Sequence, residues 1–230
     1  MEKQTIKSII VEHLWFYLAA SIFIMVALII GASIDKGDEI LFFSQRRTPF
    51  FNLVFCFATK MGEYYAYLVA LAILLFVQYR KALMLPLIGI VGGYGSVFLK
   101  KLFLQPRPYD FFTQIGKWEE IVPVEGAELL TGLTSFPSGH TCSGFALISY
   151  VAICLKKSLA LDLILFLFAM LVALSRVYLV QHFLFDIAVG AFLGLMVGLG
   201  AFHLQEQLKG AFKGIFDQHF PGIKAKNPRV

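Results

Sequence analysis

The chain has 230 residues, of which 58% are hydrophobic and only 15% are charged, with a formal net charge of +5. A soluble domain of this length carries about 25% charged residues, so the composition excludes an ordinary soluble domain. The mean hydropathy of +0.75 indicates a protein that lies mostly within a membrane.

Six apolar runs each predict a membrane-crossing helix, because a helix needs roughly 20 apolar residues to cross a hydrocarbon core. In chain order the runs are Leu14–Ile34, Gly62–Tyr79, Ala82–Leu99, His140–Leu155, Ser158–Ser175 and Phe183–His203. The second and fourth are short, and we expect them to extend into their flanks. The first is longer than the apolar stretch of a signal peptide, which is about 7–15 residues, and five further runs follow it. The predicted fold is an all-α polytopic membrane protein with six transmembrane helices.

Two segments between the runs are informative. Glu39–Lys60 mixes aromatic residues with Arg46, Arg47 and Pro49, which predicts one or two interfacial helices at the membrane surface; the alternative is a loop packed on the bundle. Tyr109–Phe136 is the longest polar connection, and loops of this length are commonly functional. It caps a site, meets lipid headgroups or is simply a structured connection.

We expect a single domain over residues 1–230, with a motif core at 100–186. A basic tail at about 207–230 either rests on the anionic cytoplasmic leaflet or is solvated without a partner. Three cysteines have no metal-ligand spacing and are predicted to be small buried residues: Cys56, Cys142 and Cys154. Three histidines belong to no group of functional residues: His13, His203 and His219.

The orientation follows from the cations near the ends of the runs. Six spans place both termini on one side, where Lys and Arg are slightly more frequent. The bias sharpens when Lys100, Arg107 and Arg176 are set aside as site residues. We therefore predict a multi-pass protein of the inner or plasma membrane with cytoplasmic termini.

Three short motifs carry ionisable groups in otherwise apolar surroundings, where such groups are costly and functional by default. They are Lys100-x6-Arg107-Pro108, Pro137-Ser138-Gly139-His140 and Ser175-Arg176-x5-His182-x3-Asp186. The third and fifth runs end, and the fourth and sixth begin, on the side opposite the termini. All three motifs are therefore predicted to meet at one membrane face, towards the periplasm or exterior.

The cations of this set suit a phosphate group. Arg107 and Arg176 can each hold two oxygens with a planar fork, and Lys100 acts as a point charge. Ser138 can donate from its hydroxyl at a predicted helix start, whose free N–H groups favour an anion. Gly139 lets the backbone come close.

The histidines suit phosphoryl transfer. His182 and Asp186 are four residues apart, so on a helix they share a face. The carboxylate can accept one ring N–H and leave the lone pair of the other nitrogen free to attack. His140 comes from another helix and can donate a proton to the leaving oxygen.

Three alternatives are weaker. A metal site is disfavoured because Lys100, Arg107 and Arg176 would repel a divalent cation. An anion channel would need polar residues along a path to the cytoplasm, and we expect the cytoplasmic halves of the spans to be almost wholly apolar, with Asp162 near one end of the fifth run. A silent scaffold is disfavoured because no motif residue is missing.

The three motifs resemble those of the type 2 phosphatidic acid phosphatase (PAP2) superfamily, in its bacterial integral-membrane lipid phosphatase branch. The resemblance implies that His182, positioned by Asp186, forms a phosphohistidine, and that His140 protonates the leaving group and then activates water. It implies no metal and no cofactor. The residues that would bind the phosphoryl oxygens are Lys100, Arg107, Ser138, Gly139 and Arg176.

One departure surrounds the predicted nucleophile. Many relatives carry a small residue and then Val before this histidine and Tyr-Pro-Ser after it, whereas this chain reads Leu179-Val180-Gln181-His182-Phe183-Leu184-Phe185. Among undecaprenyl diphosphate, phosphatidylglycerophosphate, phosphatidic acid and lipid A phosphates, we expect a broad isoprenyl or glycerolipid phosphatase. The expected partners are a lipid phosphate substrate and membrane lipids, without nucleic acid; the oligomeric state is left open.

Overall fold

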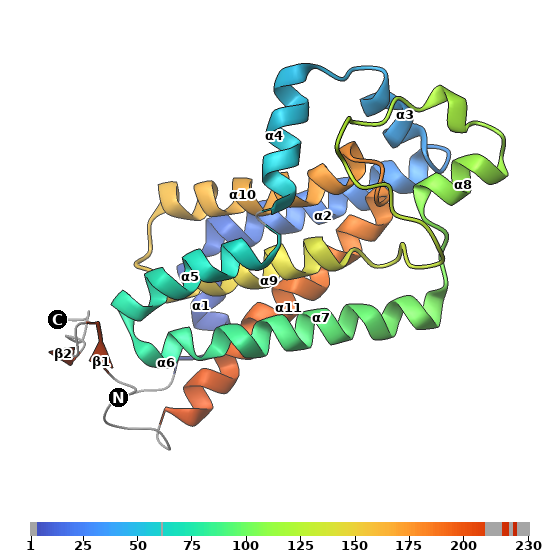
Figure 1. The fold of residues 1–230 in the computed structure, drawn as a ribbon. Helices are drawn as coiled ribbons and strands as arrows, with labels where there is room; N and C mark the ends of the chain where they lie inside the picture. Colours follow the sequence, from blue (N-terminus) through green and yellow to red (C-terminus); the bar gives the residue numbers. More distant parts are fainter. Residues whose placement is uncertain (1–3, 61, 210–217, 221–222, 225–230) are drawn as a thin grey trace.

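The computed structural model describes residues 4–60, 62–209, 218–220 and 223–224 (Figure 1). The predicted all-α class is confirmed for this part of the chain, whose two strands have only two residues each. The elements are α1 Ile6–Glu12, α2 Leu14–Ser33, α3 Asp38–Ser44, α4 Pro49–Lys60, α5 Tyr64–Val77, α6 Tyr79–Ala82, α7 Met84–Phe103, α8 Pro108–Gln114, the 3₁₀ turn η1 Trp118–Glu120, α9 Gly139–Cys154, α10 Leu159–Tyr178, α11 Leu184–Leu208, β1 Gln218–His219 and β2 Ile223–Lys224.

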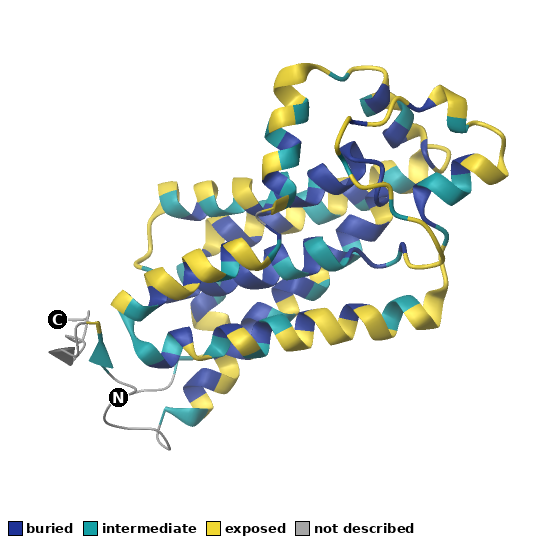
Figure 2. Cartoon of the chain, in the orientation of Figure 1, coloured by how far each residue is buried: buried dark blue, intermediate teal, exposed yellow. Residues whose placement is uncertain are grey.

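Helix α9 is the centre of the bundle. Almost all of its residues are buried, and it contacts α5, α7, α10 and α11 (Figure 2). The outer faces of α2, α5 and α7 instead expose large apolar side chains, among them Met25, Leu68 and Phe98. An apolar surface of this extent belongs against lipid rather than water.

The described residues contain four helices that are long and apolar enough to cross a membrane. They are α2, the stretch Tyr79–Gln114 that contains α7, α10 and α11. A fifth crossing exists if α4 and α5, which are bent by 62°, form one broken span. The chain is therefore a multi-pass membrane protein with four or five candidate spans.

Our expectation that the second and fourth runs extend into their flanks is wrong. Helix α5 begins only at Tyr64, after a break at Gly62 and Glu63. Helix α9 has 16 residues, because Ser138 caps its start and the chain leaves the helix at Leu155. Helix α9 is enclosed by other helices, and 13 of its 16 residues are buried.

Helices α9 and α11 approach closely along one face of small residues. A Cβ atom at Gly194 would lie 2.5 Å from the carbonyl oxygen of Cys142, and one at Gly190 would lie 2.6 Å from that of Ser138. Small residues repeating every four positions let two membrane helices bring their backbones together. This glycine seam joins the helix that carries His140 to the helix that follows His182.

The end of the bundle opposite the three motifs is not wholly apolar, which corrects our expectation. His13 Nδ1 lies 2.9 Å from Asp162 Oδ1, and both side chains are buried. The Tyr150 hydroxyl donates to Gln205 nearby on α11. His13 therefore belongs to a polar group after all, and Asp162 is paired instead of simply lying near a helix end.

The connections contain helices where we expected them. The segment Glu39–Lys60 forms α3 and α4, and Figure 1 shows α4 lying crosswise to the long helices; its position at a membrane surface stays a prediction. The loop Tyr109–Phe136 contains α8 and η1 and contacts the motif residues Lys100 and Asp186 through Thr134 and Ser135; its three expected roles stay predictions. Cys142 and Cys154 are buried and Cys56 is partly buried.

Most of the predicted basic tail lies outside the described residues. The short strands β1 and β2 pair antiparallel, and the backbone N–H of Phe220 donates to the carbonyl oxygen of Leu75 at 2.9 Å. This part of the tail therefore contacts the end of α5.

Candidate active site

A tight turn between α10 and α11 places His182. The carbonyl oxygen of Arg176 accepts hydrogen bonds from the backbone N–H groups of Gln181 (2.9 Å) and His182 (3.1 Å). Val180 takes a left-handed conformation with φ of 60°, which is rare for a β-branched residue. The turn carries His182 back under the end of α10, where its side chain is 1% exposed.

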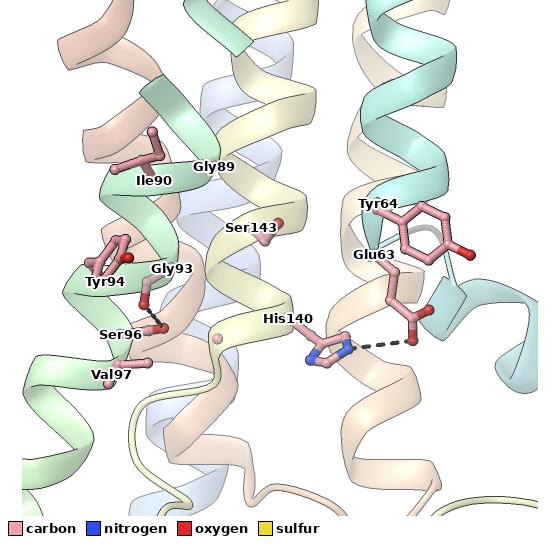
Figure 3. Close-up of a pocket in the computed structure, with 12 residues that line it drawn as sticks. Glu63, Tyr64, Gly89, Ile90, Gly93, Tyr94, Ser96, Val97, His140 and Ser143 are labelled. Atoms are coloured by element: carbon pink, nitrogen blue, oxygen red, sulfur yellow. Dashed lines mark hydrogen bonds and ion pairs between the residues drawn. The ribbon is translucent and has the colours of Figure 1, made fainter. Parts of the chain in front are cut away.

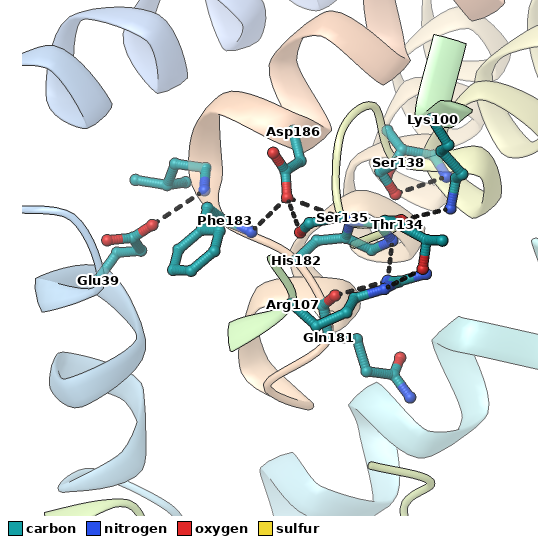
Figure 4. Close-up of polar contacts among 12 residues, drawn as sticks. Glu39, Lys100, Arg107, Thr134, Ser135, Ser138, Gln181, His182, Phe183 and Asp186 are labelled. Carbon is teal, nitrogen blue, oxygen red and sulfur yellow. Dashed lines mark hydrogen bonds and ion pairs between the residues drawn. The ribbon is translucent and has the colours of Figure 1, made fainter. Parts of the chain in front are cut away.

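Asp186 is held in place by three donors on one oxygen. Its Oδ2 accepts from Ser135 Oγ at 2.5 Å and from the backbone N–H of Phe183 at 3.0 Å. His182 Nδ1 lies 3.3 Å from the same oxygen (Figure 4). The carboxylate therefore fixes both the start of α11 and the orientation of the imidazole.

Arg107 identifies the tautomer of His182. Its Nη1 lies 2.9 Å from His182 Nε2 and donates to the carbonyl oxygen of Gln181 at 2.8 Å. A guanidinium only donates, so Nε2 must be the nitrogen that carries the lone pair. Nδ1 then carries the proton and donates it to Asp186.

Burial favours the same neutral ring. Desolvation lowers the pKa of His182 to about 3; the Asp186 carboxylate opposes this shift, and the charges of Arg107 and Arg176 add to it. At neutral pH the imidazole is therefore uncharged and has a lone pair on Nε2. A neutral imidazole with one oriented lone pair is the form in which histidine acts as a nucleophile.

The two other cations of the motifs approach the same place. Lys100 Nζ donates to the carbonyl oxygen of Thr134 at 2.9 Å. Arg176 is 3% exposed, and its Nη1 donates to the Thr59 hydroxyl. Its Nε is buried without a hydrogen-bond partner among the described residues. An unsatisfied guanidinium N–H in a buried position is a donor available to an anion.

Ser138 and Gly139 also have structural roles, in addition to the predicted contact with phosphate. Ser138 Oγ caps α9 by accepting from the backbone N–H of Thr141 at 3.4 Å. The backbone N–H of Ser138 already donates to the carbonyl oxygen of Asp186 at 3.0 Å. A Cβ atom at Gly139 would lie 3.1 Å from Ser96 Oγ, so Gly139 also allows α9 to start close to α7.

His140 lies in the first turn of α9 and faces an open pocket of about 670 Å³ between α5, α7 and α9. Its Nε2 is 3.5 Å from Glu63 Oε1 (Figure 3). Four groups act on it electrostatically: Arg176, His182, Lys100 and Arg107. The structure thus brings the predicted site residues of all three motifs to one end of the bundle.

Glu39 supports the nucleophile from outside the motifs. Its Oε1 accepts from the backbone N–H of Leu184 at 3.0 Å, and its Oε2 accepts from Gly37 at 3.1 Å. Burial raises the pKa of Glu39, while these backbone hydrogen bonds oppose the shift. A side chain on α3 therefore holds the first turn of α11, directly after His182.

Sequence reasoning missed several polar partners of the site. Ser135 fixes Asp186, Thr134 receives Lys100 and also Arg107 Nε at 3.2 Å, and Glu63 faces His140. Ser135 and Thr134 directly precede the second motif, so their proximity was a usable signal. Glu63 had no such signal, because it lies at the break before α5, far from the three motifs along the chain. Among the described residues no three His, Cys, Asp or Glu side chains gather as for a metal, and metal independence stays a prediction.

Comparisons with known proteins found a matching family model and similar solved structures. A family model described as PAP2 superfamily matches residues 81–209. The crystal structure of LpxE from Aquifex aeolicus is similar, with a TM-score of 0.60 and 27% identity over 71% of this chain and 92% of that one. The crystal structure of the first transmembrane PAP2 type phosphatidylglycerolphosphate phosphatase from Bacillus subtilis gives a TM-score of 0.49 and 26% identity, over 84% of this chain and 97% of that one. A search of curated proteins gave no match.

Proposed function

Since the chain belongs to the PAP2 superfamily of membrane phosphatases, we propose that it hydrolyses the phosphate monoester or diphosphate of a membrane lipid through a phosphohistidine on His182, without a metal. The observation that supports this proposal most directly is the chain of contacts from Asp186 through His182 to Arg107. Its distances of 3.3 Å and 2.9 Å orient a neutral imidazole with its Nε2 lone pair towards a cation. A phosphoryl group bound by that cation would lie beside the lone pair.

The proposed reaction has two steps. In the first, His182 Nε2 attacks the terminal phosphorus, and the bond from that phosphorus to the leaving oxygen breaks. The leaving oxygen belongs to the lipid alcohol in a monoester and to the lipid monophosphate in a diphosphate, and His140 gives it its proton. The positive charge of the phosphorylated ring is stabilised by Asp186. In the second, His140 takes a proton from water, the water oxygen attacks phosphorus, and the phosphorus–nitrogen bond breaks to release phosphate. His140 thus ends protonated, as it began.

The phosphate-binding set consists of Lys100, Arg107 and Arg176, supported by Ser138 and Gly139 at the start of α9. The buried, unpartnered Nε of Arg176 supports this assignment. Three cations next to a nucleophile stabilise the charge that the transferring group carries in the transition state. The same cations disfavour a divalent metal as a substitute.

The pocket beside His140 supports a lipid substrate. Its lining includes Ile90, Tyr94 and Val97 of α7, an apolar wall next to the residue that would protonate the leaving oxygen. This arrangement supports a lipid alcohol as the leaving group, of isoprenyl or glycerolipid type. Lipid A phosphates are the alternative, which the likeness to LpxE keeps open.

We further propose a single domain that crosses the membrane six times, through α2, α5, α7, α9, α10 and α11, with α3 and α4 at the membrane surface. Both termini would then be cytoplasmic and the site external. A reporter fused after Val230 should read as cytoplasmic, and one inserted at Glu125 as external. An external reading at Val230 would contradict the orientation.

The direct test is phosphate release by purified protein from a panel of lipid phosphates. We expect activity on isoprenyl diphosphate or glycerolipid phosphate that survives excess EDTA and is inhibited by vanadate. A phosphoenzyme that is stable in alkali and absent in His182→Ala would identify the nucleophile. Activity that vanishes with EDTA and returns with Mg²⁺ would sink the proposed mechanism.

A further inference from the structure

Glu63 is a carboxylate of the site that lies outside all three motifs. It precedes α5, at the break between α4 and α5, and its Oε1 lies 3.5 Å from His140 Nε2. Both side chains are 36% exposed and both line the pocket between α5, α7 and α9. Figure 3 shows the other ring nitrogen of His140 turned away from Glu63.

A proton donor at this position needs a negative neighbour. His140 stands at a helix start, where the backbone carries positive partial charge. Burial opposes the protonated form of the ring most strongly, and the charges of Arg176, His182, Lys100 and Arg107 add to this effect. Glu63, at 3.5 Å, is the carboxylate paired with this ring among the described residues.

We infer that Glu63 is the positioning residue for His140. Its carboxylate accepts a hydrogen bond from Nε2–H, stabilises the protonated ring and presents Nδ1 to the leaving oxygen. This inference rests on the proposed function. The pair would act as a second carboxylate–histidine couple, in which Asp186 orients the nucleophile and Glu63 orients the acid. A carboxylate that orients an imidazole also decides which nitrogen keeps the proton.

In the proton accounting, Glu63 accepts a hydrogen bond from Nε2–H and exchanges no proton. As the bond between phosphorus and the lipid oxygen breaks, His140 Nδ1 gives its proton to that oxygen. The ring is then neutral, and its remaining proton stays on Nε2, hydrogen-bonded to Glu63. The Nδ1 lone pair that results then takes a proton from the attacking water. Without Glu63, the neutral ring could keep its proton on Nδ1, the wrong nitrogen for the second step.

A simpler role for Glu63 would be to balance the charge of Arg176, on which it also acts electrostatically. The two roles differ in their dependence on the leaving group. Arg176 would bind the phosphoryl group of every substrate, so its disturbance would affect all substrates alike. Help from His140 matters for a lipid alkoxide, which leaves poorly without a proton, and little for a nitrophenolate.

The test follows phosphoenzyme formation in wild type, Glu63→Gln and the control Glu125→Gln, from a lipid phosphate and from nitrophenyl phosphate, across pH 6 to 9. Glu125 is exposed in the loop before α9, so its substitution removes the same charge at the same end of the bundle. For the lipid phosphate we expect Glu63→Gln to move the alkaline limb of the rate about one pH unit lower. Its rate at pH 8 should fall roughly tenfold, because a general acid contributes about 10²–10⁴-fold in all.

The nitrophenyl phosphate rate should stay within about twofold of wild type, and Glu125→Gln should match wild type on both substrates. Equal losses on both substrates, or an unmoved alkaline limb in Glu63→Gln, would overturn this inference alone. If Glu63→Gln does not fold, Glu63→Asp decides: a loss confined to the lipid phosphate supports the role, and an equal loss refutes it. A wild-type chain that forms no phosphohistidine would overturn this inference and the proposed function together.

Discussion

Two buried histidine–aspartate pairs lie at opposite ends of this bundle. At one end, His182 Nδ1 is 3.3 Å from Asp186 Oδ2, and its second nitrogen is 2.9 Å from Arg107 Nη1. At the other, His13 Nδ1 is 2.9 Å from Asp162 Oδ1, and its second nitrogen has no hydrogen-bond partner among the described residues. Under the proposed function, the same two side chains at similar distances serve a reaction at one end and a helix contact at the other, and the group that faces the second ring nitrogen decides between these roles.

Removing each histidine gives the largest contrast. His182→Ala should reduce phosphate release by about 10⁴-fold or more, because loss of a nucleophile removes the covalent route. His13→Ala should leave the rate per folded molecule within about twofold, since His13 contacts neither the cations nor the phosphoryl site. Phosphate release normalised to monodisperse protein measures both. A comparable loss in folded His13→Ala would break the comparison.

The carboxylates should differ in the same way. Asp186→Asn removes the charge that fixes the tautomer of His182 and should lower turnover by about 10³–10⁴-fold. Asp162→Asn, with the same change of one atom, should leave turnover near the wild-type value. The measurement is single-turnover phosphoenzyme formation with nitrophenyl phosphate. Similar rates for the two variants would show that the Asp186 contact does not orient the nucleophile.

Arg107 is the group that distinguishes the two ends, so shortening its reach tests the comparison directly. Lys at position 107 keeps the charge but cannot donate to the carbonyl oxygen of Gln181 and hold a phosphoryl group with a planar fork. Arg107→Lys should cost about 10²–10³-fold in kcat/KM and weaken vanadate inhibition. Inhibition by vanadate that is unchanged in Arg107→Lys would place the phosphate elsewhere.

The pair at His13 should show itself in stability instead. His13→Ala leaves the Asp162 carboxylate buried without its partner, which costs about 1–3 kcal/mol for an unsatisfied group. His13→Gln keeps a donor and should lose less. Thermal unfolding in detergent is expected to rank wild type above His13→Gln and His13→Gln above His13→Ala. An alanine variant as stable as wild type would show that the contact contributes nothing.

The smallest effect is on the pH dependence of the nucleophile. With its pKa lowered to about 3, His182 stays neutral from pH 8 to pH 6, and phosphoenzyme formation from nitrophenyl phosphate should be nearly flat over this range. A histidine with an ordinary pKa near 6.5 would lose about fourfold. The stability linked to His182 is present above about pH 6.5 and falls as the pH drops towards 3, because only the unfolded chain binds the proton in that window. A fourfold decline in wild type between pH 8 and pH 6 would contradict the lowered pKa of His182.

The sequence was sufficient for the residues that can be placed by counting on which side of the membrane each apolar run begins or ends. Lys100, Arg107, His140 and His182 all occur where an apolar run begins or ends, so counting the runs placed them together. The pairing of His13 with Asp162 joins the first and fifth runs, and no local pattern encodes such a contact. Glu63 is missed for the same reason. The bend before α5 was also missed, because the single glycine and glutamate that interrupt the run give only a weak signal.

The glycine seam between α9 and α11 divides the molecule mechanically. Gly190 and Gly194 hold the helix of His140 against the helix that follows His182 with backbone atoms nearly in contact, so a side chain at either position would force the helices apart. We therefore expect His140 and His182 to keep a fixed separation. Helix α5 is bent from α4 by 62° and buries only Ala66, Ala70 and Leu74, so we expect it to move more easily than α9 and α11. Any motion that admits a bulky lipid chain is therefore expected on the side of α5, and thick or laterally compressed bilayers should slow the access of substrate without disturbing the distance between the reacting groups.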